Sequence, residues 1–136
     1  TLYNENDVNN AQSNVETQIS TYGDELIGLY GGNNVSGDGI ALGLKNAGSG
    51  NKILGIGVDS DSLEIEALEA GNLYAIIVQT PYDQGYKAVE NAVEYLQTGE
   101  NSESEKHINC PSQAVTKENM DTEESKALLD PTILKK

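Results

Sequence analysis

Short apolar runs alternate with helix-like segments along most of the chain. The runs cover residues 26–30, 53–58 and 75–78, and each is followed by apolar positions at helical spacing. Such alternation is typical of a parallel β-sheet whose strands are joined by crossover helices. We therefore predict an α/β protein with a mostly parallel, doubly wound sheet and helices on both faces.

The first two helices are predicted from apolar stripes and from residues that start or end helices. One stripe runs over residues 8–19 after Asp7, whose carboxylate suits an N-cap. The other runs over residues 40–47 and stops at Gly48, because glycine readily takes the left-handed conformation found just past a helix.

Two further helices follow the second and third apolar runs. The shorter spans about residues 62–70, and Asp61 with Glu64 resembles a capping box at its start. The longer begins at Pro81, a favoured first helical residue, and ends at Gly99. Its apolar side chains lie on one side: Tyr82, Tyr86, Val89, Val93 and Leu96.

The last third of the chain gives weaker patterns. Residues 101–105 are polar and acidic, which predicts an exposed loop. Ile108 and residues 114–116 are predicted as short strands, and residues 123–129 as a short helix before Pro131.

A polar side chain recurs where each apolar run ends. Asn33 follows the first run, Asp59 the second and Gln79 the third. Ligands of parallel sheets bind beyond the carboxyl ends of the strands, so these side chains point to one place. Together they donate and accept hydrogen bonds, as a neutral polyol such as a sugar requires. Taken singly, Asn33 and Asp59 also suit helix caps, and Gln79 suits a surface position.

Composition narrows the classes of partner. The 136 residues are short enough for at most one domain, and 8 basic against 22 acidic residues give a net charge of −14. Such a charge repels phosphates, which argues against nucleic acid and anionic lipid as partners. No apolar stretch is long enough to span a membrane, and no signal peptide is found at the start, where the chain opens at Thr1.

Residues that point to other chemistry are better explained by structure. Cys110 lies three residues after His107, but no nucleophile motif surrounds the pair. Gly55 and Gly57 lie inside a predicted strand, outside the turn that a dinucleotide fingerprint requires, and fit close packing of a crossover helix. Asp59 lacks the further carboxylates and the lysine of a phosphoacceptor site. We predict no catalytic residue, no metal site and no cofactor.

The order of these segments resembles the periplasmic sugar-binding protein family, the ribose-binding-like solute receptors of ABC importers. Residues 29–34 followed by 39–43 are similar to the family's strand, Asn-containing loop and Ala-Leu-Gly helix. Four further similarities are a hydrophobic-Gly-hydrophobic-Asp motif at 56–59, a helix, Gly and strand step at 69–75, a Gln-x-Pro and Gly-Tyr pattern at 78–81 and 85–86, and a closing segment at 116–119.

The resemblance implies a type I periplasmic-binding-protein-like C-terminal lobe in which Asn33, Asp59 and Gln79 face a sugar. Residues 1–136 would form a single partial domain of a non-catalytic receptor, which delivers its sugar to a membrane permease. The receptor would work in the periplasm or, if lipid-anchored through a missing N-terminus, on the outer face of the membrane.

The absent N-terminal lobe leaves an apolar surface to explain. In an intact receptor the helix over residues 82–98 and parts of 106–136 would contact that lobe. We therefore expect the apolar stripe from Tyr82 to Leu96 to fold back on the chain or to pair with a second copy of it.

Three alternatives stay open. The effector domain of a lactose-repressor-like transcription regulator shares the fold and the small-molecule site, and an upstream DNA-binding headpiece would favour it. The ligand-sensing domain of a membrane receptor is the second. An α/β enzyme that uses Asp59 or Cys110 is the third, but no second catalytic group stands at a recognisable spacing.

Overall fold

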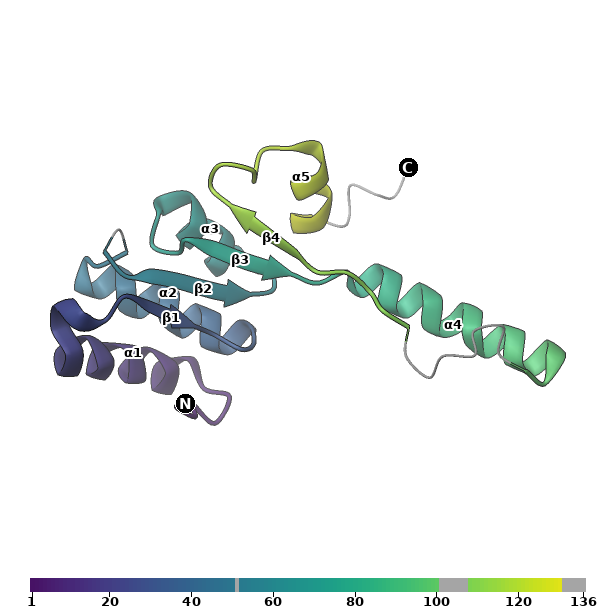
Figure 1. The fold of residues 1–136 in the computed structure, drawn as a ribbon, viewed down its shortest axis with the longest axis horizontal. Helices are drawn as coiled ribbons and strands as arrows, with labels where there is room; N and C mark the ends of the chain where they lie inside the picture. Colours follow the sequence, from purple (N-terminus) through teal and green to yellow (C-terminus); the bar gives the residue numbers. More distant parts are fainter. Residues whose placement is uncertain (51, 101–107, 131–136) are drawn as a thin grey trace. The chain divides into compact units, whose positions relative to one another are not determined.

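The computed structural model describes residues 1–50, 52–100 and 108–130, which divide into two compact units. Residues 1–78 with 113–136 form the first unit, and residues 79–112 form the second. The first unit contains α1 (Val8–Tyr22), the 3-10 helix η1 (Gly23–Glu25), β1 (Gly28–Tyr30), α2 (Asn34–Ala47), β2 (Leu54–Val58), α3 (Ser62–Ala70), β3 (Ala75–Val78), β4 (Gln113–Thr116) and α5 (Glu123–Leu129) (Figure 1). The second contains α4 (Pro81–Thr98).

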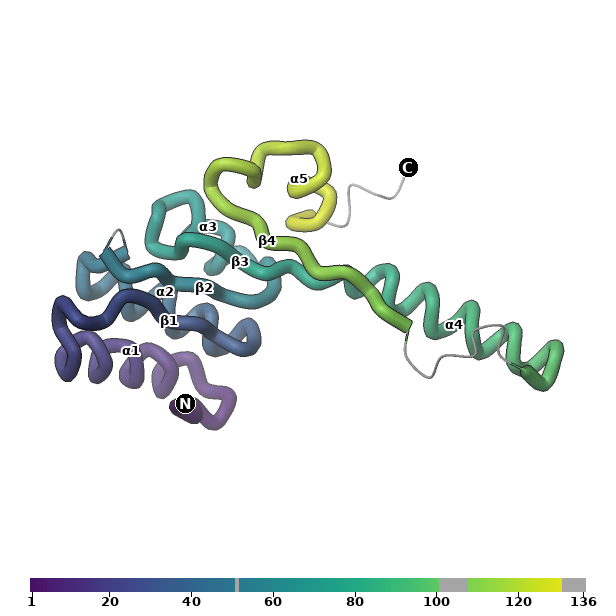
Figure 2. The backbone as a smooth tube through the Cα atoms, viewed as in Figure 1, coloured from purple at the N-terminus to yellow at the C-terminus, as the bar shows by residue number. Residues whose placement is uncertain are grey.

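The sheet of the first unit has the strand order β1-β2-β3-β4 (Figure 2). β1, β2 and β3 are parallel to one another, and β4 runs antiparallel to β3. The predicted α/β class with a mostly parallel sheet is therefore confirmed. Because the three parallel strands are neighbours, their carboxyl ends lie at one edge of the sheet.

Glycines allow the first two helices to pack closely. α1 packs against α2, and α2 packs against β2. A Cβ on Gly39 would collide with Ala11 Cβ, and a Cβ on Gly43 would lie 2.5 Å from Val15 Cγ1, so α2 approaches α1 only because these two positions lack side chains. Gly55 of β2 similarly faces α2, as the sequence predicts.

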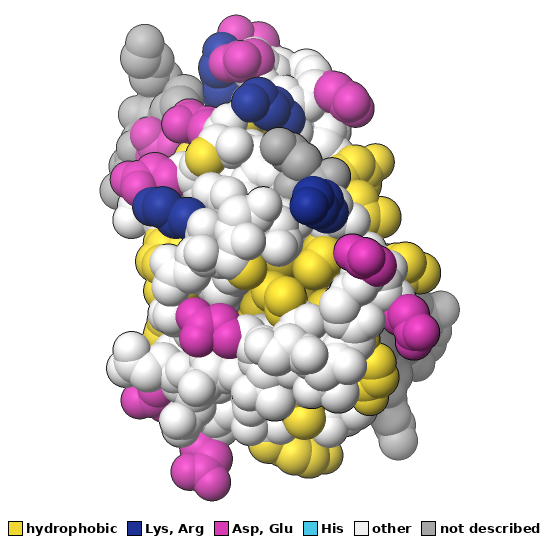
Figure 3. Space-filling view, turned by 90° about the vertical axis from the view of Figure 1, so that its left-hand side faces the viewer, with side chains coloured by type: hydrophobic (Ala, Val, Ile, Leu, Met, Phe, Trp, Pro, Cys, Tyr) yellow, Lys and Arg dark blue, Asp and Glu magenta, His cyan; other side chains and the backbone are white. Residues whose placement is uncertain are grey.

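The hydrophobic core lies between the sheet and helices α1, α2 and α3. Leu44 of α2, Leu68 of α3 and Ile76 of β3 are each fully buried within it. Alternate side chains of a strand point to opposite faces of the sheet, and on the other face Tyr30 is 66% and Leu54 is 52% exposed. Figure 3 shows hydrophobic side chains exposed among charged ones on one side of this unit.

The residues predicted to begin and end the helices do so in the structure. The side chain of Asp7 accepts a hydrogen bond from the Asn10 N–H at 2.9 Å and caps α1. Gly48 and Gly71 end α2 and α3 in the left-handed conformation, with φ of 62° and 78°. The short helix predicted over residues 123–129 is confirmed as α5.

Two predictions for the last third of the chain have other outcomes. The strand predicted at Ile108 is wrong, because this residue has no strand structure. One isolated apolar residue among polar ones does not define a side of a strand. The loop predicted over residues 101–105 lies outside the described residues, and so does His107.

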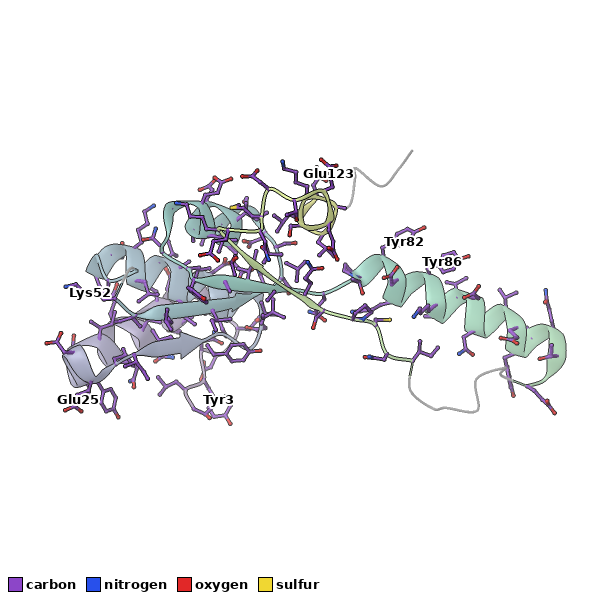
Figure 4. All side chains as sticks on the ribbon, turned by 45° about the horizontal axis from the view of Figure 1, so that its top comes forward. Tyr3, Glu25, Lys52, Tyr82, Tyr86 and Glu123 are labelled. Carbon is purple, nitrogen blue, oxygen red and sulfur yellow. The ribbon has the colours of Figure 1, made fainter. Side chains whose placement is uncertain are left out.

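The second unit exposes the apolar stripe of α4. Tyr82 and Tyr86 project from the same side of the helix (Figure 4), and their rings stack with centroids 6.2 Å apart. Val89, Val93 and Leu96 are also exposed. Pairing of this stripe with a second copy of the chain stays a prediction. No helix of the described residues combines the length and apolar character needed to cross a membrane.

Substitution of Gly55 by alanine should destabilise the first unit. A Cβ at this position would lie 2.6 Å from Leu44 Cδ1 and 3.0 Å from Ile40 Cγ2. We expect Gly55→Ala to lower the free energy of unfolding by about 1–3 kcal/mol in urea titrations, because overpacking strains a dense core. Gly32→Ala is the matched control, since a Cβ there has no atom within 4 Å. Equal stability of the two variants would contradict this account.

Candidate functional site

The carboxyl end of β1 leads into Asn33, which caps α2. Its Oδ1 accepts hydrogen bonds from the backbone N–H of Ser36 at 3.0 Å and from Ser36 Oγ at 2.7 Å. The helix-cap alternative for Asn33 is therefore correct, but a cap uses only Oδ1. Asn33 is exposed, and the cap leaves its Nδ2 amide unused as a hydrogen-bond donor.

Asn4 lies beside this cap and is missed by the sequence analysis. Its Nδ2 donates a hydrogen bond to Ser36 Oγ at 3.1 Å, which links the segment before α1 to the start of α2. Glu5 and Asn6 follow with φ of 54° and 59°, so the loop has two consecutive left-handed residues that are not glycine. The sequence carries the signal, because polar residues follow an apolar pair, Leu2 and Tyr3, as they do at the other candidate loops.

Asp59 follows β2 in an unusual backbone conformation. Its φ is 92°, a region that residues with a side chain rarely adopt. Its backbone N–H donates to the Ile77 carbonyl at 3.0 Å, which extends the pairing of β2 with β3 by one residue. Strained backbone of this kind persists where surrounding structure holds it in place, and it is enriched at ligand sites.

Gln79 directly follows Val78, the last residue of β3, and begins the second unit. It is exposed. Asn33 and Asp59 follow neighbouring parallel strands at one edge of the sheet, as predicted. The convergence of Gln79 on the same ligand stays a prediction, because Gln79 belongs to the other unit.

A groove of about 960 Å³ runs along the first unit beside Asn33. Its walls are formed by residues 1–6, by α1 and by β1. Asn4, Asn33 and Ser36 are among the residues that line it. Tyr3 extends from the N-terminal segment at this place (Figure 4). The groove therefore reaches one of the two candidate loops of the first unit.

Two buried carboxyl groups lie behind these loops. Glu64 of α3 is 0% exposed and Asp38 of α2 is 8% exposed. Burial, and then the nearby carboxylates of Asp61 and Asp38, raise the pKa of Glu64 from 4.5 to about 8. Burial, and then repulsion by Asp61 and a hydrogen bond with it, raise the pKa of Asp38 from 3.8 to about 6. Glu64 is therefore a neutral acid at pH 7.

The capping box predicted for α3 is half correct. Asp61 Oδ1 accepts a hydrogen bond from the Glu64 N–H at 2.9 Å, as a cap should. The Glu64 side chain does not return to the cap but turns inward, where both of its oxygens are buried. The Asn34 side chain and the Val58 backbone face the carboxyl group and partly oppose its pKa shift. The Nδ2 of Asn34 is also buried.

The described residues contain no group of three or more His, Cys, Asp or Glu side chains that could hold a metal ion. Cys110 is a half-buried free thiol in the second unit. The candidate site therefore consists of the loops that carry Asn33 and Asp59, with Asn4 beside the first and Glu64 behind both.

Comparison with known proteins gives a consistent set of relatives. A family model described as a periplasmic binding protein domain matches residues 1–101. A solved ABC transporter solute-binding protein from Agrobacterium vitis with bound D-fucose is 29% identical, with a TM-score of 0.81 over 95% of this chain and 43% of that one. Another from Agrobacterium vitis, bound with α-D-tagatopyranose, is 26% identical, with a TM-score of 0.85 over 95% of this chain and 42% of that one.

A third solved relative extends the set to another genus. The solute-binding protein from Burkholderia graminis, in complex with D-arabinose, is 26% identical, with a TM-score of 0.76 over 88% of this chain and 41% of that one. Among curated proteins, none is similar enough to the chain to count as a match.

The mostly parallel sheet with flanking helices is the fold of the type I periplasmic binding proteins. The chain belongs to the periplasmic binding protein domain family, a family of non-enzymatic solute-binding proteins. It spans less than half the length of the solved structures that it matches. The lobe described above is thus one part of the architecture seen in these relatives.

Proposed function

We propose that the chain forms the sugar-binding C-terminal lobe of a solute-binding receptor for an ABC-type importer. The observation that carries this proposal is the placement of Asn33 and Asp59 after neighbouring parallel strands, where the ligands of such sheets bind. Sugars are bound in the solved relatives named above, which supports the same class of ligand here.

The candidate side chains suit recognition of hydroxyl groups. Asp59 supplies a carboxylate that accepts hydrogen bonds from two neighbouring hydroxyls. Asn33 supplies its Nδ2 amide as a hydrogen-bond donor. Gln79 adds both a donor and an acceptor from the segment that leaves β3. A site of this kind rejects analogues that leave its polar groups unpaired, so it selects among sugars without making or breaking a bond.

The complete receptor would use this lobe in transport. A second lobe would close over the sugar, and ligand binding would shift the population from open to closed receptor. The closed receptor would present its sugar to a membrane permease. It would do so from the periplasm or, with a lipid anchor, from the outer face of the cell membrane.

Calorimetric titration of the complete receptor that contains this chain tests the proposal. The panel consists of D-fucose, D-tagatose and D-arabinose, with other pentoses and hexoses. We expect at least one sugar to bind with a dissociation constant of about 1 μM or lower, corresponding to about 8 kcal/mol of binding free energy. Amino acids and nucleosides of similar size are the control ligands. Binding of a control ligand with no response to any sugar would reject the proposal.

A further inference from the structure

The carboxyl group of Glu64 lies where three backbone segments meet. A Cβ built on Gly37 in the first turns of α2, or on Gly57 in β2, would collide with Glu64 Oε1. Glu64 itself stands in the first turn of α3, held there by the Asp61 cap. Glycine at both facing positions therefore leaves a space that the carboxyl group fills.

The segments that border Glu64 are the ones that carry the candidate ligand groups. The Gly37 N–H donates to the Asn33 carbonyl at 2.9 Å, so Gly37 closes the turn that Asn33 begins. Gly57 precedes Asp59 by two residues in the chain. A change in the volume or hydration of the Glu64 carboxyl group would therefore shift the Asn33 loop relative to the Asp59 loop.

We propose that Glu64 is a positioning residue, which sets the spacing between the Asn33 and Asp59 loops and thereby controls the affinity for ligand. This inference rests on the proposed function. Glu64 touches no ligand in this account and acts through the backbone on either side of it.

The protonation state of Glu64 gives this role a measurable signature. Asp38 faces it from α2, Asp61 faces it from the start of α3, and no cation is among the groups of the described residues that shift its pKa. An ionised Glu64 would be repelled by both carboxylates and would draw water toward its carboxyl group, which lies against the closely spaced backbones of Gly37 and Gly57. The state that binds ligand well is therefore the one with neutral Glu64, which dominates below a pKa of about 8.

The test measures sugar affinity of the complete receptor against pH, in the wild type, Glu64→Gln and Glu66→Gln. Glu66 is the matched control, because it stands on the same helix, undergoes the same carboxyl-to-amide change and is exposed. At pH 9 about one molecule in ten keeps neutral Glu64, so wild-type affinity should fall about tenfold between pH 6 and pH 9. Glu66→Gln should show the same fall, and Glu64→Gln should show a flat profile.

A second readout separates this inference from the proposed function. In the ligand-free receptor, the amide resonances of Ser36 and Asp59 should shift with a midpoint near pH 8 in the wild type and in Glu66→Gln. This step should be absent from Glu64→Gln, which keeps the lower step of Asp38 near pH 6. If Glu64→Gln folds poorly, Glu64→Met replaces it, because methionine also cannot titrate. Equal pH profiles of affinity in all variants would overturn the positioning role and leave sugar binding standing. Titrating resonances without binding of any sugar would support the coupling and reject the proposed function.

Discussion

The free energy of unfolding should fall by about 2–4 kcal/mol between pH 5 and pH 8, and Glu64→Gln should remove most of this fall. The pKa of Glu64 rises from 4.5 in the unfolded chain to about 8 in the fold. Between these values the folded state binds more protons than the unfolded state, so stability is full at the acid end and is lost as pH rises.

The size of this effect follows from the shift. Each pKa unit is worth about 1.4 kcal/mol, which sets an upper limit near 5 kcal/mol, and relaxation around the ionised group reduces it. Asp38 adds a contribution of the same sign at lower pH, because its pKa is also raised, to about 6. Urea titrations at pH 5 and pH 8 measure the fall. Glu66→Gln should show the same fall in the free energy of unfolding as the wild type. An unchanged fall in Glu64→Gln would show that Glu64 is not the group responsible.

Removal of the Asp59 side chain should separate binding from folding. In the complete receptor we expect Asp59→Ala and Asp59→Gly each to weaken sugar binding by more than about tenfold, because a buried carboxylate-hydroxyl hydrogen bond is worth about 1.5–3 kcal/mol. The two variants should differ in stability. Asp59 has a φ of 92°, which glycine adopts freely and alanine does not, so Asp59→Gly should be the more stable of the two.

Calorimetry gives the affinities and thermal unfolding gives the stabilities. Ser60→Ala is the control, since Ser60 is the adjacent residue and is also half-buried. Sugar binding that is unchanged in both Asp59 variants would remove Asp59 from the site. Lower stability of Asp59→Gly than of Asp59→Ala would show that the backbone at this position is not strained.

The parts of the fold that are predicted well are those with local signals at both ends. α3 has Asp61 before it and Gly71 after it, and its predicted span of residues 62–70 is confirmed. α5 is confirmed with its predicted bounds even though its apolar pattern is short. In both helices the residues that fix the ends are close in sequence to the residues that they cap, so tertiary contacts are not needed to find them.

The role of Glu64 could not be predicted in this way. Asp61 and Glu64 carry the spacing of a capping box, in which the glutamate returns to the helix start. The side chain turns inward because Gly37 and Gly57, which are far from it in the sequence, leave room for it. Asn4, in contrast, has a local sequence signal. Polar residues follow the apolar pair Leu2 and Tyr3, as they follow the apolar runs at the other loops, but the pair is too short to be recognised as a strand.

The pairing of β3 with β4 has a consequence for protein engineering. Val78 and Gln113 are direct partners in this antiparallel pair, although the whole second unit separates them along the chain. Strands paired in this way can be joined by a two-residue hairpin such as Asn-Gly. Residues 79–112 are therefore excisable in principle, and splicing Val78 to Gln113 through such a turn would yield a minimal scaffold that keeps the Asn33 and Asp59 loops.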